Sequence, residues 1–178
     1  MLATLLNALD GRTRALRTRP GVSAIFFLNN ISYIRREVLS SQIGDLLGEG
    51  CEDLLNKKMR TSKSTYLEMW SPLISALLDA GTDLSGAVGA IKAGIGAVKG
   101  GGDKRENKDR FLRFQDALEE IELIHSTARL SEGDSELRER LKGEVERMVV
   151  PTYSKFLARH RTDISKSESS IPFAWNSS

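Results

Sequence analysis

The chain has 178 residues and a formal net charge of +2; 40% of its residues are hydrophobic, 6% aromatic and 28% charged. This length and apolar content suffice for one domain with its own core, and the plentiful Leu, Ala, Glu, Arg and Lys favour helix over strand. The single cysteine, Cys51, excludes an intrachain disulfide framework and a thiolate zinc site, and it indicates a reducing compartment.

The first residues, MLATLLN, do not have the form of a signal peptide, because they lack its basic flank and its long apolar run. No window reaches the uninterrupted run of about 18 apolar residues that indicates a transmembrane helix. The sequence therefore predicts neither a secretory signal nor a membrane span.

Residues 2–17 form the first expected helix, which Pro20 and Gly21 end. The second expected helix starts near Val22 and contains the stretch FFLNNISYIRREVLSS. Apolar residues recur along it at helical spacing, at Phe27, Ile31, Ile34 and Val38.

This second helix is apolar nearly all round at its start, so we expect neighbours on several of its sides. Asn29 and Asn30 lie in the middle of this apolar stretch. Because a buried amide without a partner is costly, both asparagines should have hydrogen-bond partners.

Gly48 and Gly50 predict a break before a third, long helix from about residue 52 to 79. Its apolar stripe consists of Tyr66, Trp70, Leu73 and Leu77. Pro72 falls inside this helix and should kink it, because proline lacks an N–H and crowds the preceding turn.

Residues 81–102 read GTDLSGAVGAIKAGIGAVKGGG, with glycine at eight of 22 positions. Each glycine costs a helix interior about 1 kcal/mol, so we expect a flexible insertion or a weakly helical loop. A phosphate-binding loop is rejected, because no strand precedes the segment and no Gly-Lys-Ser/Thr sequence ends it.

Helix is expected to resume near Lys108, with a stripe made of Phe111, Phe114, Leu118, Ile121 and His125. Asp134 is a candidate N-cap of the last helix, in which Pro151 should introduce a bend. The stripe of that helix consists of Leu137, Leu141, Val145 and Met148.

Together these segments predict an all-α fold, an antiparallel bundle of about five helices. We assign residues 1–161 to this domain, with the Gly-rich insertion 81–102 inside it. The Ser-rich residues 162–178, TDISKSESSIPFAWNSS, are expected to form a disordered tail.

The residues that most often carry chemistry offer no catalytic, cofactor or metal site. His125 lies on an apolar stripe and is expected at the edge of the core, whereas His160 lies in a basic run near a helix end, where the helix dipole favours cations. Cys51 has no supporting base in the sequence and is expected to be a small buried residue.

Basic clusters are the remaining signal, and each is either a contact for anionic lipid head groups, worth about 1 kcal/mol per residue, or ordinary solubilising charge. One cluster near the start is Arg12, Arg14, Arg17 and Arg19. The candidate lipid contacts are Lys57, Lys58, Arg60, Lys63, Lys155, Arg159 and Arg161. No nucleic-acid partner is expected, since these residues are not interleaved with aromatics in a known motif.

The order of several segments resembles the C-terminal region of the seventy-kilodalton subunit of the exocyst. The matching stretches are LNNISYI (28–34), LLG (46–48), KDRF (108–111) followed by Phe114, LR (137–138), and VPTYSKF (150–156). The family has a proline at the position of Ser135. The resemblance covers roughly residues 1–161.

The resemblance implies a stack of antiparallel helices at one end of a long helical rod, without catalysis or cofactors. It implies a protein that tethers secretory vesicles to the plasma membrane, working with other exocyst subunits and Rho-family GTPases and binding phosphatidylinositol bisphosphate. Such a protein is cytoplasmic and peripheral to the plasma membrane at secretion sites.

Two departures from the family pattern leave alternatives open. Much of the rod is missing, and SKSESSIPFAWNSS stands where the family has a basic Lys-Tyr-Ile-Lys-Tyr segment that binds lipid. Lipid contacts would then come from upstream residues such as Lys57, Lys58 and Arg60. One alternative is a truncated relative that serves only as a protein-interaction module. Another is a small ligand-binding or enzymatic helical bundle, which predicts a polar cavity around His125 or Cys51.

Overall fold

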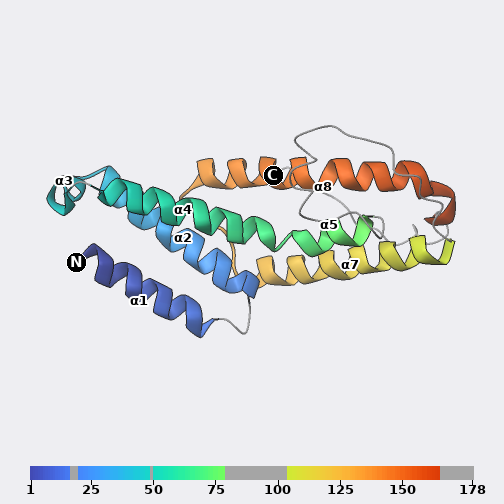
Figure 1. Ribbon diagram of the computed structural model, residues 1–178, viewed down its shortest axis with the longest axis horizontal. Coiled ribbons are helices and arrows are strands. Elements are labelled where there is room, and N and C mark those ends of the chain that lie inside the picture. Colours follow the sequence, from blue (N-terminus) through green and yellow to red (C-terminus); the bar gives the residue numbers. More distant parts are fainter. Residues whose placement is uncertain (17–19, 49, 79–103, 165–178) are drawn as a thin grey trace. The chain divides into compact units, whose positions relative to one another are not determined.

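The computed structural model describes residues 1–16, 20–48, 50–78 and 104–164, and side chains within these ranges except those of residues 104 and 161–164. All regular structure in these ranges is α-helical (Figure 1), which confirms the predicted all-α class. The helices are α1 (Leu2–Ala15), α2 (Pro20–Leu39), α3 (Ile43–Leu47), α4 (Cys51–Glu68), α5 (Ser71–Leu77), α7 (Lys104–Thr127) and α8 (Ser135–Ile164).

Two predicted segments fall wholly or mostly outside this description. The Gly-rich insertion 81–102 lies outside it entirely. The predicted tail, 162–178, begins inside α8, which continues to Ile164, and its other residues lie outside the described ranges. No helix in the described part of the chain is long and apolar enough to cross a membrane.

The chain divides into two compact units. The first consists of Met1–Ser71 and Leu118–Glu146, and the second of Pro72–Ala117 and Arg147–Ser178. Helices α7 and α8 contribute residues to both units.

In the first unit, α2 packs against both α1 and α4, and successive long helices run antiparallel (Figure 1). Their shared core consists of Leu6, Ile31, Val38, Cys51 and Leu55, with Phe27, Ile34 and Met59 partly buried against it. The apolar stripe predicted along the second helix is therefore confirmed. Cys51, which is 8% exposed, occupies the small apolar position expected of it.

Helix α2 begins two residues earlier than the sequence predicts. Pro20 and Gly21, expected to separate two helices, are the first residues of α2. Proline is favoured at this position because its missing N–H would have no helical partner there. Gly21 lets α7 approach closely, since a Cβ at this position would lie 2.5 Å from the Cδ1 atom of Ile124.

The prediction of one kinked helix over residues 52–79 is wrong, because the helix ends at Glu68 and α5 starts at Ser71. The Trp70 N–H donates to the Leu67 carbonyl at 3.1 Å, a tightened three-residue turn that closes α4. Pro72 then lies in the first turn of α5, where its missing N–H removes no helical hydrogen bond. This break and the short α3 explain why the described residues form seven helices rather than about five.

The second unit has an aromatic core. Phe111 and Phe114 of α7 and Phe156 of α8 are buried, and the rings of Phe114 and Tyr153 stack with centroids 5.1 Å apart. His160 lies one turn before Ile164, where α8 ends, so its predicted place near a helix end is confirmed. Its ring is 8% exposed and lies 5.0 Å from the Phe156 ring, so this histidine also packs into the core.

Candidate functional site

One face of α2 binds the loop between α7 and α8, which comprises residues 128–134. Asn29 donates from Nδ2 to the Arg129 carbonyl at 2.9 Å and accepts at Oδ1 from the Ser131 N–H at 3.0 Å. One turn and two turns further along α2, Ser32 donates to the Asp134 carboxylate and Arg36 donates to the Gly133 carbonyl at 3.0 Å. This face therefore fixes the start of α8 relative to α2.

Asp134 also caps α8, as the sequence predicts. Its Oδ1 accepts from the Leu137 N–H at 3.0 Å, which satisfies one of the free donors of the first turn. Burial raises the pKa of Asp134, but the hydrogen bonds from Ser32 and Leu137, together with the nearby Arg36 and Lys63, outweigh burial and lower the pKa below its ordinary value. The carboxylate is therefore ionised at neutral pH.

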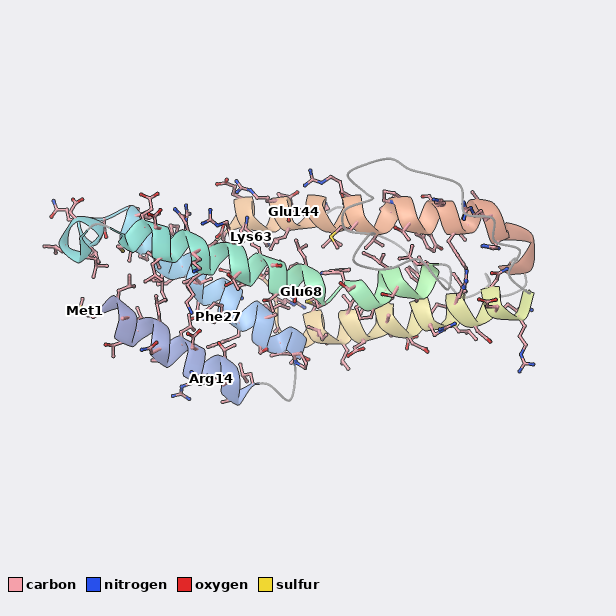
Figure 2. The ribbon with its side chains drawn as sticks, in the orientation of Figure 1. Met1, Arg14, Phe27, Lys63, Glu68 and Glu144 are labelled. Carbon is pink, nitrogen blue, oxygen red and sulfur yellow. The ribbon has the colours of Figure 1, made fainter. Side chains whose placement is uncertain are left out.

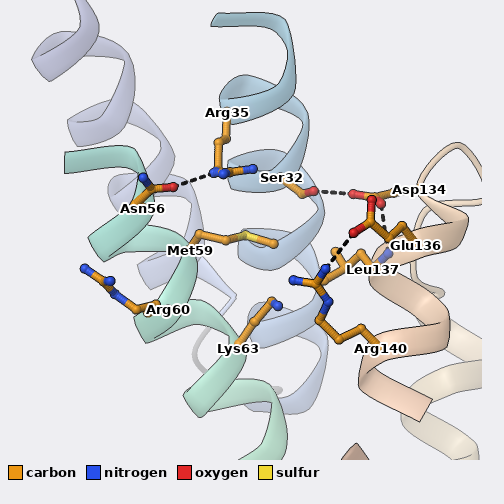
Figure 3. Close-up of a pocket in the computed structure, with 10 residues that line it drawn as sticks. All are labelled: Ser32, Arg35, Asn56, Met59, Arg60, Lys63, Asp134, Glu136, Leu137 and Arg140. Carbon is orange, nitrogen blue, oxygen red and sulfur yellow. Dashed lines mark hydrogen bonds and ion pairs between the residues drawn. The ribbon is translucent and has the colours of Figure 1, made fainter. Parts of the chain in front are cut away.

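Next to this loop, residues of α2, of α4 and of the first turns of α8 line an open cleft of about 250 Å³, which we call the basic cleft (Figure 3). Its lining residues are Ser32, Arg35, Asn56, Met59, Arg60, Lys63, Asp134, Glu136, Leu137 and Arg140. Four of these side chains are cations and two are carboxylates, so the lining carries an excess of positive charge.

Hydrogen bonds hold several of the charged groups in place. Arg35 donates from Nε to the Asn56 Oδ1 at 2.7 Å, and Arg140 forms an ion pair with Glu136 at 2.6 Å, one turn away on α8. Arg60 is exposed and lies at the outer edge of the cleft (Figure 3). Among the described residues, Arg60 has no hydrogen bond or ion pair.

Lys63 is half-buried, and its ammonium group points from α4 toward Arg140 of α8 (Figure 3). Burial lowers the pKa of Lys63, and the positive charge of Arg140 lowers it further, while Glu144, beside it in Figure 2, acts in the opposite direction. No hydrogen bond or ion pair joins Lys63 to another residue in the described ranges. Two cations therefore face one another across the cleft, an unfavourable arrangement that an anion between them would relieve.

The structure separates the candidate contacts on α4 rather than gathering them on one surface. Lys58 forms an ion pair with Asp10 of α1 at 2.9 Å, and its ammonium lies 5.7 Å from the centre of the Phe27 ring. Lys58 thus joins three helices. Lys57 is exposed, whereas Arg60 and Lys63 line the basic cleft.

The candidate contacts on α8 belong to the second unit. Lys155 and Arg159 are exposed and one helical turn apart. Arg161 lies within α8, but its side chain is outside the description. A role of these residues in lipid binding stays a prediction.

His125 belongs to a packed aromatic group in the first unit. Its Nδ1 lies 2.8 Å from the Ile121 carbonyl, which requires an N–H there, so its Nε2 accepts from the Tyr66 hydroxyl at 3.1 Å. The ring lies 5.8 Å from that of Trp70. Burial raises the pKa of Tyr66 to about 12, although the neighbouring Trp70 opposes part of this rise. The position of His125 at the core edge is confirmed.

The enzymatic alternative predicts a polar cavity around His125 or Cys51, but the basic cleft is lined by neither. In the described ranges, no group of three or more His, Cys, Asp and Glu residues could hold a metal ion.

The sequence does not predict Arg35, Asn56 and Arg140 as members of one site, because they lie far apart along the chain, on three different helices. The signal that could have found part of the cleft is the spacing of Asn56, Arg60 and Lys63. Side chains at positions i, i+4 and i+7 share one face of a helix. The contributions of α2 and α8 depend on tertiary packing and leave no such local signal.

Comparison with known proteins gives one family match, to the C-terminal part of the Exo70 exocyst complex subunit, over residues 1–174. The chain is 27% identical to exocyst complex component EXO70A1 of Arabidopsis thaliana over an alignment of 164 residues that covers 89% of this chain and 24% of the relative. It is 26% identical to exocyst complex protein EXO70 of Gibberella zeae over an alignment of 171 residues that covers 91% of this chain and 26% of the relative.

A third relative, exocyst complex component EXO70 of Saccharomyces cerevisiae, is 27% identical over an alignment of 150 residues that covers 83% of this chain and 22% of the relative. The chain thus spans about a quarter of the length of the curated relatives it matches. No solved structure gives a significant match.

Proposed function

The chain belongs to the family of Exo70 exocyst subunits, whose C-terminal part it matches, and from this we propose that it is a non-enzymatic exocyst-type module that acts in tethering vesicles to the plasma membrane during exocytosis. The observation that carries the proposal is the family match over residues 1–174. The three relatives described above are all named as exocyst components or exocyst proteins.

In this proposal the partners are other exocyst subunits and a Rho-family GTPase, and the protein is cytoplasmic and peripheral to the plasma membrane. Packed helices suit such a role, because a rigid helical surface can bind partner proteins without a catalytic pocket. The protein half of the proposal is tested by isolating the chain from cells and identifying the exocyst subunits that accompany it.

The lipid half of the proposal concerns phosphatidylinositol bisphosphate, and it rests on Lys57 of α4 together with Lys155 and Arg159 of α8, all three exposed. A basic residue near an anionic membrane contributes about 1 kcal/mol. The Lys58 ammonium pairs with Asp10 in the structure, and Lys58 is therefore not used in the test variants. These residues lie in different units, so each unit is to be tested by its own variant.

The test is co-sedimentation with phosphatidylcholine vesicles, with and without phosphatidylinositol bisphosphate, over a salt series. We expect salt-sensitive binding to the phosphoinositide vesicles that Lys57→Glu or Lys155→Glu weakens. Lys108→Glu is the matched control, since Lys108 is exposed on α7 and lies outside the candidate set. Absence of binding in low salt would refute the lipid half and leave a protein-interaction module.

A further inference from the structure

The lining of the basic cleft has more cations than carboxylates. Lys63 forms no hydrogen bond or ion pair with another described residue, although the charges of Glu144 and Asp134 act on it, and it faces Arg140 (Figure 3). Arg140 is paired with Glu136, but the two side chains are 54% and 82% exposed. An ion pair this exposed contributes little to stability, so Arg140 can turn toward a ligand at small cost.

The Arg35 side chain, on another wall of the cleft, is oriented by a hydrogen bond. Its Nε donates to Asn56, which orients the guanidinium at the upper end of the cleft (Figure 3). Its terminal nitrogens have no hydrogen-bond partner among the described residues. A planar guanidinium oriented in this way suits the oxygens of a phosphate or a carboxylate, which it can bind through two parallel hydrogen bonds.

The charge of the lining distinguishes between these two anions. Asp134 is committed to Ser32 and to the first turn of α8, and Glu136 is the only other carboxylate of the lining, against four cations. This excess matches a phosphomonoester, which carries a charge of about −1.5 to −2 and three strong acceptor oxygens. A single carboxylate ligand would neutralise only half of this excess positive charge of the lining.

The size of the cleft is consistent with a phosphorylated side chain. Its volume of about 250 Å³ is roughly eight times the 30 Å³ that one water occupies in the liquid. That is room for a phosphate group together with the side-chain atoms that bear it.

The surroundings favour a protein ligand over a lipid head group. Arg35 of α2 and Lys63 of α4 are half-buried, whereas Arg140 and Glu136 of α8 are 54% and 82% exposed, and Glu144 lies near Lys63. A flat anionic bilayer would bring its own negative charge against these carboxylates. A single phosphorylated side chain on an extended segment would not.

We propose that the basic cleft binds a phosphoserine or phosphothreonine side chain of a partner protein, with Lys63, Arg140 and Arg35 as its main contacts. This goes beyond the proposed tethering function and does not depend on membrane binding.

The test is an NMR titration of the ¹⁵N-labelled chain with a glycine peptide whose only charged side chain is one phosphoserine. The same peptide with an unmodified serine is the control. We expect shifts that saturate with the phosphopeptide and are centred on residues lining the cleft, and none with the serine peptide. Lys63→Gln or Arg140→Gln should weaken binding about tenfold or more, because each removes a charge-assisted hydrogen bond. Lys108→Gln, a control outside the cleft on exposed Lys108 of α7, should leave binding unchanged.

Inorganic phosphate and phosphoinositide vesicles separate the possible sources of the phosphate group. We expect phosphate to compete with the phosphopeptide, and the cleft variants to bind vesicles as the wild type does. The proposal is overturned if the phosphopeptide causes no shifts at the cleft, or if the serine peptide binds equally well. It is also overturned if the folded Lys63→Gln/Arg140→Gln variant keeps full affinity for the phosphopeptide. Loss of vesicle binding in the cleft variants, without phosphopeptide binding, would assign the cleft to a lipid head group instead.

Discussion

Asn29 and Ser131 lie 102 residues apart in the sequence, and the Ser131 N–H donates to the Asn29 side chain at 3.0 Å. The same side chain donates to the Arg129 carbonyl at 2.9 Å. The Asn29 amide thus offers both a donor and an acceptor to the backbone of the loop between α7 and α8. Since this loop leads into α8, the asparagine helps to position one wall of the basic cleft.

Replacing Asn29 by alanine should lower the free energy of unfolding by about 1–2 kcal/mol, because it removes two hydrogen bonds of roughly 0.5–1.5 kcal/mol each. Asn30→Ala is the matched control, since the Asn30 side chain donates to the Phe26 carbonyl of its own helix and, within the described part of the chain, to no other residue. Urea unfolding of both variants checks this. Equal losses would show that the loop contact contributes nothing beyond helix-internal bonding.

Asp134→Ala should cost about 1–2 kcal/mol, because it removes the cap of α8 as well as the acceptor of Ser32. Asp134→Asn should cost less, since its side-chain oxygen can still cap the helix. The measurement is again the urea midpoint at neutral pH.

The charge of Asp134 should also make stability depend on pH. Its pKa is lower in the folded state than the ordinary value of 3.8. Its contribution is therefore fully present above that ordinary value and is lost as the pH falls through the folded-state pKa. The Asp134→Asn variant should lack this part of the acid dependence. If the free energy of unfolding depends on pH in the same way for this variant and for the wild type, the role given to the carboxylate is contradicted.

Tyr66 should remain neutral in the folded protein until about pH 12, whereas its ordinary pKa is 10.0. A raised pKa means that the contribution to stability is intact below pH 10.0 and is lost as the pH rises toward 12. Tyrosinate absorbance of the wild type should show a late ionisation step, which Tyr66→Phe removes. A Tyr66→Phe variant with an unchanged titration curve would place that step on another tyrosine.

Lys63→Gln should make the protein more stable at neutral pH, because the charged amine is disfavoured by burial and by Arg140. The pKa of Lys63 is lower in the folded state, so the penalty is present in full below that pKa and disappears as the pH rises to its ordinary value of 10.5. Thermal unfolding as a function of pH measures this. Added phosphate should stabilise the wild type more than Lys63→Gln; equal stabilisation would show that phosphate binds elsewhere.

Local patterns predicted much of the first unit. The spacing of Ile31 and Val38 indicated which face of α2 is buried, and Asp134 stood where a helix needs a cap; both expectations are confirmed. The asparagine pair was expected to need partners, but the sequence could not name Arg129 and Ser131, because those contacts depend on a loop 100 residues away.

The errors have physical causes of the same kind. The sequence predicts that Pro72 kinks a helix, but α4 ends before it and Pro72 lies in the first turn of α5. Local propensity does not distinguish a kinked helix from two separate helices at such a proline. Lys58 resembled its basic neighbours in the sequence, yet the turn of the helix points it at Asp10. The basic cleft combines Arg35, Lys63 and Arg140 from three helices, so only their packing reveals it.

The central claim is that this chain works as part of an exocyst. The most direct test is to express it with an affinity tag in the organism that encodes it, crosslink mildly, and quantify by mass spectrometry the exocyst subunits that accompany it. Two tagged variants are compared with the wild type: Asn29→Ala shows the effect of lower stability, and Lys63→Gln shows the effect of changing the basic cleft. The account predicts that other exocyst subunits are enriched with the wild-type chain over a tag-only control. A folded, well-expressed chain that enriches none of them would contradict it.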